Sequence, residues 1–163
     1  MTQEEKQLLL QDLCERLPYD TIASVTHYDE ITKEAGETLG YIKGVTYNGK
    51  IEFFYLPDYT EDDGAFNRFS AENIKPYLRP MSSMTKNEKR ELQNILSNNK
   101  HGVYLKHDEE WEIIVDSYYP YIPLEGFTNG FNWLNKKMFD YRGLIPMGLA
   151  IEAPEGMYET KTE

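Results

Sequence analysis

Leucines near the start of the chain recur at helical spacing. Three of them are four residues apart, which places them on one face of a helix: Leu9, Leu13 and Leu17. Thr2 and Glu5 have the spacing of a capping box, and Pro18 ends the pattern. The pattern predicts a helix over residues 2–17 with an apolar stripe on which Cys14 also lies, as a small core residue.

Two further helices are predicted from caps and apolar positions. Thr85 with Glu88 repeats the capping-box spacing, and the helix that follows has Leu92 and Leu96 on its apolar side and ends near Asn98. Thr128 or Asn129 is expected to cap the third. The apolar face expected there contains Phe131, Leu134 and Met138.

Strand signals occur between these helices. Asn48-Gly49 separates two β-prone runs and predicts a hairpin, because both residues of a type I′ turn need positive φ. Residues 21–35 are ambiguous, although 21–28 are rich in β-branched side chains and resemble a strand. Residues 103–119 are expected to form a second hairpin, with a helix over 109–119 as the competing interpretation. Two prolines make residues 72–84 an extended segment, interpreted as an edge strand.

These elements predict a single α+β domain over residues 1–153. Three helices pack on antiparallel hairpins that form a small curved sheet of about four to six strands. Residues 141–151 are expected to form a short ordered segment packed on the core, and residues 154–163 a frayed C-terminal tail.

Composition places the chain among globular proteins. It has 163 residues, 40% hydrophobic and 28% charged, and a single cysteine. One thiol cannot form an internal disulfide, the N-terminus lacks the features of a signal peptide, and the apolar runs are about three residues long. We therefore expect a cytoplasmic protein without membrane segments.

The charge is strongly polarised. The net charge is -11, yet residues 68–106 contain eight Lys or Arg and three Asp or Glu. Nucleic-acid or nucleotide binding through this basic region is one functional alternative, with Lys86, Lys89 and Arg90 for phosphates and Tyr77 for stacking. The acidic net charge disfavours it, because such a field repels phosphate backbones.

The chain offers little catalytic chemistry. Of its three histidines, His27, His101 and His107, the last two could supply metal ligands together with Asp108 and Glu109. Two surface histidines in turns are the favoured interpretation, so neither a metal nor a cofactor is expected. Ser82 and Ser83 lack a glycine elbow. Gly126 and Gly130 are a weak phosphate-loop signal. A small hydrolase assembled from dispersed residues is the second alternative, and its sign would be a polar pocket with a histidine beside a carboxylate.

Aromatic residues indicate an interaction surface instead. Tyr118, Tyr119 and Tyr121 lie among prolines with few charges, a composition typical of protein interfaces. Tyr141 and Arg142 are added to this patch as a second candidate surface. Asp140, which precedes them, is interpreted as pairing with Arg142 at a helix end.

Three segments resemble a known group of proteins. They are residues 74–85 (Ile-Lys-Pro-Tyr-Leu-Arg-Pro-Met-Ser-Ser-Met-Thr), residues 133–157 with Phe-Asp-Tyr-Arg-Gly-Leu-Ile at 139–145, and more weakly residues 12–19. Together they resemble uncharacterised small proteins of gut bacteria, their phages and mobile elements. The resemblance implies a phage or mobile-element setting and no activity. The expected function is that of a non-enzymatic accessory protein that binds an unidentified protein partner.

Overall fold

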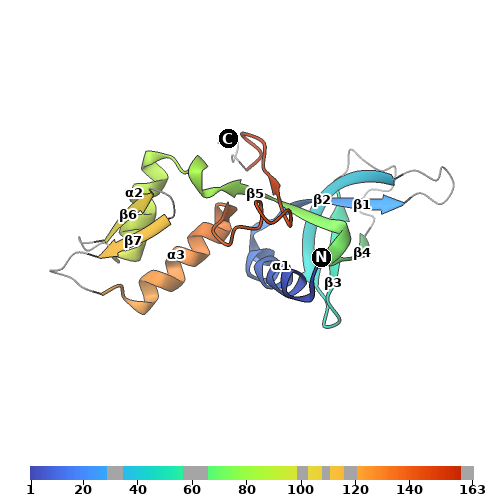
Figure 1. Cartoon of the computed structure of the whole chain (residues 1–163), viewed down its shortest axis with the longest axis horizontal. Coiled ribbons are helices and arrows are strands. Elements are labelled where there is room, and N and C mark those ends of the chain that lie inside the picture. Colours follow the sequence, from blue (N-terminus) through green and yellow to red (C-terminus); the bar gives the residue numbers. More distant parts are fainter. Residues whose placement is uncertain (29–34, 57–65, 99–102, 108–110, 116–120, 159–163) are drawn as a thin grey trace.

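The computed structural model describes residues 1–28, 35–56, 66–98, 103–107, 111–115 and 121–158. Figure 1 shows two masses connected by strand β5 and the end of helix α3. We call the mass with α1 and the large sheet the sheet lobe, and the mass formed by residues 81–141 the helical lobe. The predicted α+β class is confirmed, with three α-helices and two sheets among the described residues.

Seven strands of the described chain form the large sheet. Their bounds are β1 Ile22–Tyr28, β2 Ala35–Val45, β3 Lys50–Tyr55, β4 Phe66–Ser70, β5 Ile74–Pro80, β8 Phe139–Asp140 and β9 Ile151–Glu152. The order is β4-β3-β2-β1-β5-β8, with β9 also paired to β5. The predicted Asn48-Gly49 hairpin joins β2 to β3, with Gly49 at φ +73°.

The predicted small sheet of antiparallel hairpins is wrong. Strands β8 and β9 run parallel to β5, so the large sheet is mixed. These strands are two residues long, too short for an alternating pattern to reveal them. Residues 74–80 are also not an edge strand, because β1 pairs with one half of β5 and β8 and β9 pair with the other. The ladder to β1 ends at Pro76, which has no N–H to donate.

Helices α1 (Gln3–Arg16) and α2 (Lys86–Leu96) confirm the predicted capping boxes at Thr2 and Thr85. Helix α2 ends before Asn98, whose φ of +52° is the left-handed conformation that asparagine tolerates after a helix. Short 3-10 segments follow α1 and flank β5, at 17–19, 71–73 and 81–83.

Helix α3 begins earlier than predicted. It spans Leu124–Lys136, with Pro123 at its N-cap, so Thr128 and Asn129 lie inside it and Met138 lies beyond its end. Gly126 and Gly130 are also inside the helix, where glycine is usually unfavourable. They are there because α2 lies close: a Cβ on Gly126 would be 2.3 Å from the Leu96 carbonyl oxygen. The phosphate-loop interpretation of these glycines is therefore wrong.

The second predicted hairpin is confirmed as β6 (Val103–His107) and β7 (Trp111–Val115), and residues 111–115, the described part of the competing helix, are strand. It is a separate two-stranded sheet that packs beside α2 rather than joining the large sheet. Its register places Leu105 opposite Ile113 and Tyr104 opposite Ile114.

Each lobe has its own cluster of buried apolar residues. In the sheet lobe, α1 packs on the sheet through Leu9 and Leu13. In the helical lobe, α2, α3 and β6 meet around Leu92, Leu96 and Trp133. The single domain predicted over 1–153 stays a prediction, and the structure adds that the chain has two hydrophobic clusters.

The C-terminal residues that the structure describes are attached to the sheet. The Tyr158 hydroxyl donates to the Tyr77 carbonyl oxygen at 2.8 Å and accepts from the Ile22 N–H at 3.2 Å. Burial raises the pKa of Tyr158. Residues 159–163 of the predicted tail lie outside the described residues.

Candidate functional site

A buried ion pair lies where the two lobes meet. Asp12 and Arg16 of α1 have no exposed surface, and the guanidinium donates to both Asp12 carboxylate oxygens at 2.7 and 3.0 Å. It also donates to the carbonyl oxygens of Phe139 at 2.8 Å and Asn135 at 3.4 Å. Arg16 therefore places a positive charge at the C-terminal end of α3, where the helix dipole favours one.

The ion pair continues to the surface through three half-buried side chains. Arg142 donates to Glu15 at 2.5 Å and its Nε lies 3.4 Å from Asp12, while the Tyr141 hydroxyl donates to Glu15 at 2.8 Å. The Tyr141 ring lies between two guanidinium groups, 5.7 Å from Arg16 and 5.0 Å from Arg142. Two acids and two bases make this cluster neutral.

The pKa values of the cluster reflect this pairing. Burial alone raises the pKa of Glu15, but hydrogen bonds from Arg142 and Tyr141 outweigh it and lower that pKa. Burial, with the hydrogen bond to Glu15, raises the pKa of Tyr141 to about 12. The pKa of Glu15 is lowered and that of Tyr141 is raised, so both move away from neutral pH, as is typical of groups held in a structural pair.

Asp140 binds backbone N–H groups instead of the arginine predicted as its partner. Its two carboxylate oxygens accept the backbone N–H groups of Leu144 and Ile145, each at 2.8 Å. It thereby fixes the turn after β8 instead of pairing with Arg142, so the predicted pair is wrong. The turn places Arg142, Ile145 and Pro146 beside the helical lobe.

An apolar groove opens between this turn, α3 and the β6–β7 hairpin. Its volume is about 800 Å³. Leu92 and Leu96 of α2 and Gly130 and Leu134 of α3 line it. Further lining comes from Leu105 and Ile113 of the hairpin, from Phe127 and Phe131 of α3, and from Tyr141 and Arg142.

Helix α3 presents uncovered apolar side chains at this groove. Phe127 is 37% exposed, Phe131 is 45% exposed, and Ile113 across the groove is 42% exposed. The Phe131 ring lies 5.4 Å from that of Tyr141, which joins the exposed apolar surface to the charged junction. Leu124, one turn before Phe127, extends this face of the helix and is more exposed still.

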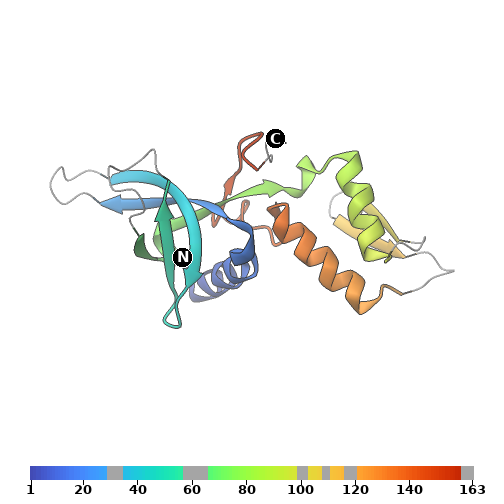
Figure 2. The same cartoon turned by 180° about the vertical axis from the view of Figure 1, so that it is seen from behind.

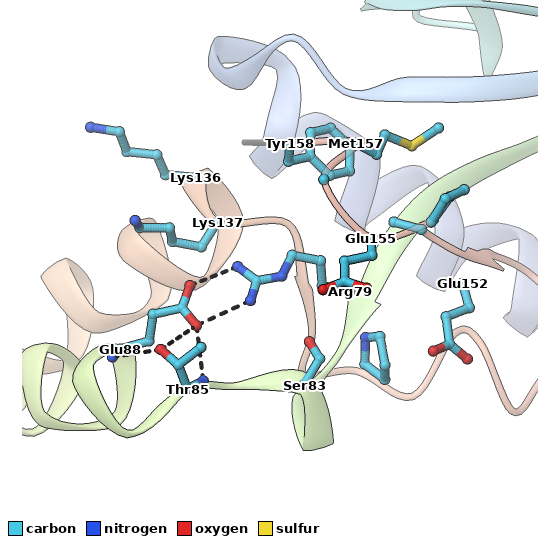
Figure 3. Close-up of a pocket in the computed structure, with 14 residues that line it drawn as sticks. Arg79, Ser83, Thr85, Glu88, Lys136, Lys137, Glu152, Glu155, Met157 and Tyr158 are labelled. Carbon is cyan, nitrogen blue, oxygen red and sulfur yellow. Dashed lines mark hydrogen bonds and ion pairs between the residues drawn. The ribbon is translucent and has the colours of Figure 1, made fainter. Parts of the chain in front are cut away.

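A second, polar cavity of about 640 Å³ lies on the other side of the lobe junction. Figure 3 shows Arg79 of β5 pointing at Glu88 of α2, to which it donates at 2.7 and 3.1 Å. Glu88 also accepts from the N–H and the hydroxyl of Thr85. Lys136 and Lys137, at the end of α3, and Glu152 and Glu155 complete the charged lining.

The Arg79–Glu88 ion pair is the main polar contact of this cavity. Burial alone raises the pKa of Glu88, but hydrogen bonds from Arg79 and Thr85 outweigh it and lower that pKa to about 2. The hydroxyl of Thr85 is engaged with Glu88 in the capping box, and no histidine is among the described residues that line this cavity. Ser83, one of the two serines singled out from the sequence, also lines this cavity.

The predicted interaction patch is divided by the structure. Tyr118 and Tyr119 lie outside the described residues. Tyr121 is exposed just before α3 and does not line the groove. Tyr141 and Arg142 do line the groove. Phe127 and Phe131 line it as well, and the sequence did not identify these two as surface residues.

The predicted basic region is spread over both lobes. Arg68 on β4 pairs with Glu52, and Arg79 pairs with Glu88. The candidate contacts Lys86, Lys89 and Arg90 lie together on α2. The candidate stacking residue Tyr77 is on β5, in the large sheet.

The histidines are not gathered in the described part of the chain. His27 lies on β1 near Thr38, His101 falls outside the described residues, and for His107 only the strand placement is described. No group of three or more His, Cys, Asp or Glu in the described ranges is placed to hold a metal ion. No helix of the described chain is long and apolar enough to cross a membrane.

Cys14 is exposed, so the predicted core placement is wrong. The residue is exposed as a whole, but its thiol is partly buried. This partial burial, with a smaller effect of Glu15, raises the pKa of the thiol and so disfavours the reactive thiolate. Asp12 and Arg16 occupy the buried face of α1 instead. The sequence signal for them was their i, i+4 spacing, which is equally typical of an exposed pair.

Comparison with known proteins gives no relative from which to transfer a function. No protein-family model matches the chain, and no curated protein or solved structure shows a significant match. The resemblance to small proteins of gut bacteria, phages and mobile elements stays a prediction.

Proposed function

We propose that this protein is a non-enzymatic binding protein whose partner is another protein and whose binding site is the apolar groove. The observation that carries the proposal is the uncovered apolar surface of Phe127 and Phe131 on α3, opposite Ile113 of the hairpin. Contiguous exposed apolar surface with polar groups around it is typical of interaction sites.

The composition of the groove supports a protein partner. Aromatic residues and arginine dominate the energetics of protein interfaces, and the groove combines Phe127, Phe131, Tyr141 and Arg142. Its walls are held by the junction of α1 with α3, because Glu15 fixes both Tyr141 and Arg142. A site held in this way loses little conformational entropy when a partner binds.

The charge distribution also favours a protein partner over a nucleic acid. Residues 81–142 contain eight Lys or Arg and nine Asp or Glu, whereas the rest of the chain has nine and nineteen. The groove therefore lies in the nearly neutral part of an acidic protein. There apolar contact meets little long-range repulsion, and no strongly basic field attracts phosphate.

The cellular setting belongs to the same proposal. The resemblance of residues 74–85 and 133–157 suggests an accessory protein of a phage or mobile element that acts in the cytoplasm. The partner is then a protein of the host or of the phage.

Affinity capture from a lysate of the natural host tests the proposal. Tagged wild-type protein is compared with Phe131→Glu, which charges the groove, and with Tyr47→Glu, which charges a fully exposed tyrosine in the β2–β3 turn of the other lobe. Circular dichroism verifies that all three are folded. We expect one stoichiometric protein that survives high salt with wild type and Tyr47→Glu and disappears with Phe131→Glu.

Two results would contradict the proposal. One is a capture without any protein above background, and the other is a protein that Phe131→Glu retains as well as wild type does. Nucleic acid recovered at low salt and lost at high salt would instead support the basic residues Lys86, Lys89 and Arg90.

A further inference from the structure

Strand β7 has a free edge. Among the described strands it pairs with β6 alone, so one side of it has backbone N–H and C=O groups without a strand partner. Its side chains are half uncovered on both faces, with Ile113 42% and Ile114 41% exposed. The hairpin packs on α2 through β6, so the edge of β7 is the side at which a further strand could pair.

The β6–β7 hairpin also covers only part of the apolar surface of the helices on which it packs. Val103 and Leu105 of β6 are buried against the cluster of α2 and α3. Ile113 of β7 is not, and beyond it Phe127 and Phe131 of α3 line an open groove. One more strand beside β7 would cover this surface.

The charge around β7 selects the kind of strand. Residues 103–116 contain five acids and one base, Lys106, which lies opposite Glu112 in the β6–β7 register, so the acids outnumber the base around β7. A second copy of β7 would bring the same acids against each other. Antiparallel pairing centred on Glu112 would set the two Glu112 side chains opposite each other, and like charges opposite each other are destabilising. A basic strand is complementary where a second copy is not.

We propose that an extended, basic segment of a partner protein adds as a strand to the free edge of β7, with its apolar side chains in the groove and its lysines or arginines on the Glu112 face. This rests on the proposed function and specifies its partner. Alternation follows from strand geometry, because successive side chains such as those of Glu112 and Ile113 point to opposite faces. Backbone hydrogen bonds supply affinity, and the groove selects the alternate residues.

Three nine-residue peptides test the inference on the whole protein by fluorescence anisotropy. The first alternates valine and lysine. The second has glutamate in place of each lysine. The third has the same composition as the first, but its valines are placed at the spacing of a helix face instead of at every second position. We expect saturable binding of the first and binding of the second that is about fivefold weaker, the ratio for one cross-strand charge pair. The helical order should bind more weakly than the alternating order.

A charge swap gives the matched control. Glu112→Lys should remove the preference for the lysine peptide, whereas Glu91→Lys, an exposed acid of α2, should leave it unchanged. Amide hydrogen exchange locates the peptide. N–H groups alternate in direction along a strand, so one of the Ile113 and Ile114 amides faces the free edge and should exchange more slowly in the complex.

The outcomes separate this inference from the proposed function. Failure of the alternating lysine peptide to bind, binding equal to that of the helical order, or unchanged exchange at both amides would overturn strand addition. The proposed function would still stand if a captured partner required Phe131. If capture of the partner did not depend on Phe131, the proposed function itself would be contradicted.

Discussion

Among the polar residues of this protein, Arg16 is the one whose replacement we expect to lower the free energy of unfolding the most. Its guanidinium is fully buried and donates four hydrogen bonds, two to Asp12 and one each to the carbonyl oxygens of Phe139 and Asn135. Arg16→Met keeps most of the apolar stem and removes the charge. Asp12 then stays buried with Arg142 as its remaining partner, 3.4 Å away.

The magnitude follows from that geometry. Breaking a buried ion pair by removing one partner costs about 3–5 kcal/mol. Because Arg142 still compensates part of the Asp12 charge, we expect a loss in unfolding free energy of about 3 kcal/mol. For a domain of this size that corresponds to a fall in Tm of about 6–12 °C.

Urea denaturation followed by circular dichroism measures the loss. Lys43→Met is the matched control, because Lys43 and Asp20 form an ion pair with both side chains largely exposed, which is worth less than about 1 kcal/mol. Asp12→Leu completes a double-mutant cycle with Arg16→Met, and the double variant should lose less than the sum of the two single variants. An Arg16→Met variant no less stable than Lys43→Met would refute the reasoning.

Three further predictions concern other contacts. The pKa of Glu88 is lowered from 4.5 to about 2, so its stabilising contribution is complete above pH 4.5 and is lost as the pH falls towards 2; the difference in unfolding free energy between wild type and Glu88→Gln should shrink over that range. Gly126→Ala should lower Tm although alanine favours helices, because the new Cβ would meet the Leu96 carbonyl oxygen, and such overpacking costs about 1–3 kcal/mol. Tyr141→Phe removes the hydrogen bond to Glu15 and should cost about 1.5–3 kcal/mol in urea denaturation.

Each of these has a result that would contradict it. A stability difference for Glu88→Gln that is constant from pH 6 to pH 2 would mean that the carboxylate is not held by Arg79. A raised Tm for Gly126→Ala would mean that α2 and α3 are further apart than described. Retention of full stability by Tyr141→Phe would mean that the hydroxyl contributes nothing at the lobe junction.

Local signals in the sequence were enough for the elements that depend on neighbouring residues. The capping boxes at Thr2 and Thr85 and the turn at Asn48-Gly49 each involve groups at most three residues apart, so their physics is present in the sequence itself. The N-cap of α3 was predicted five or six residues too late, at Thr128 or Asn129 instead of Pro123. Its two glycines are unfavourable locally and are explained only by the close approach of α2.

The sequence predicted only part of the candidate site, because the rest of it depends on contacts between distant segments. Tyr141 and Arg142 were singled out from the sequence and do line the groove, but they were expected to accompany Tyr121, which does not. Phe127 and Phe131 could not be recognised as surface residues, because α3 has apolar positions on more than one face. Which face is covered depends on the width of a hairpin that belongs to another part of the chain.

The sequence by itself determined the three helices, the two hairpins and the polarised charge of this protein, because each depends on composition or on residues close together in the chain. Tertiary structure decided that Arg16 and Asp12 are buried, since the Arg16 guanidinium donates to carbonyl oxygens more than one hundred residues away and Asp12 pairs with Arg16 inside the fold. It also decided the parallel pairing of β8 and β9 with β5 and the free edge of β7. These features follow from which surfaces meet when distant segments pack, and that is a property of the folded chain as a whole.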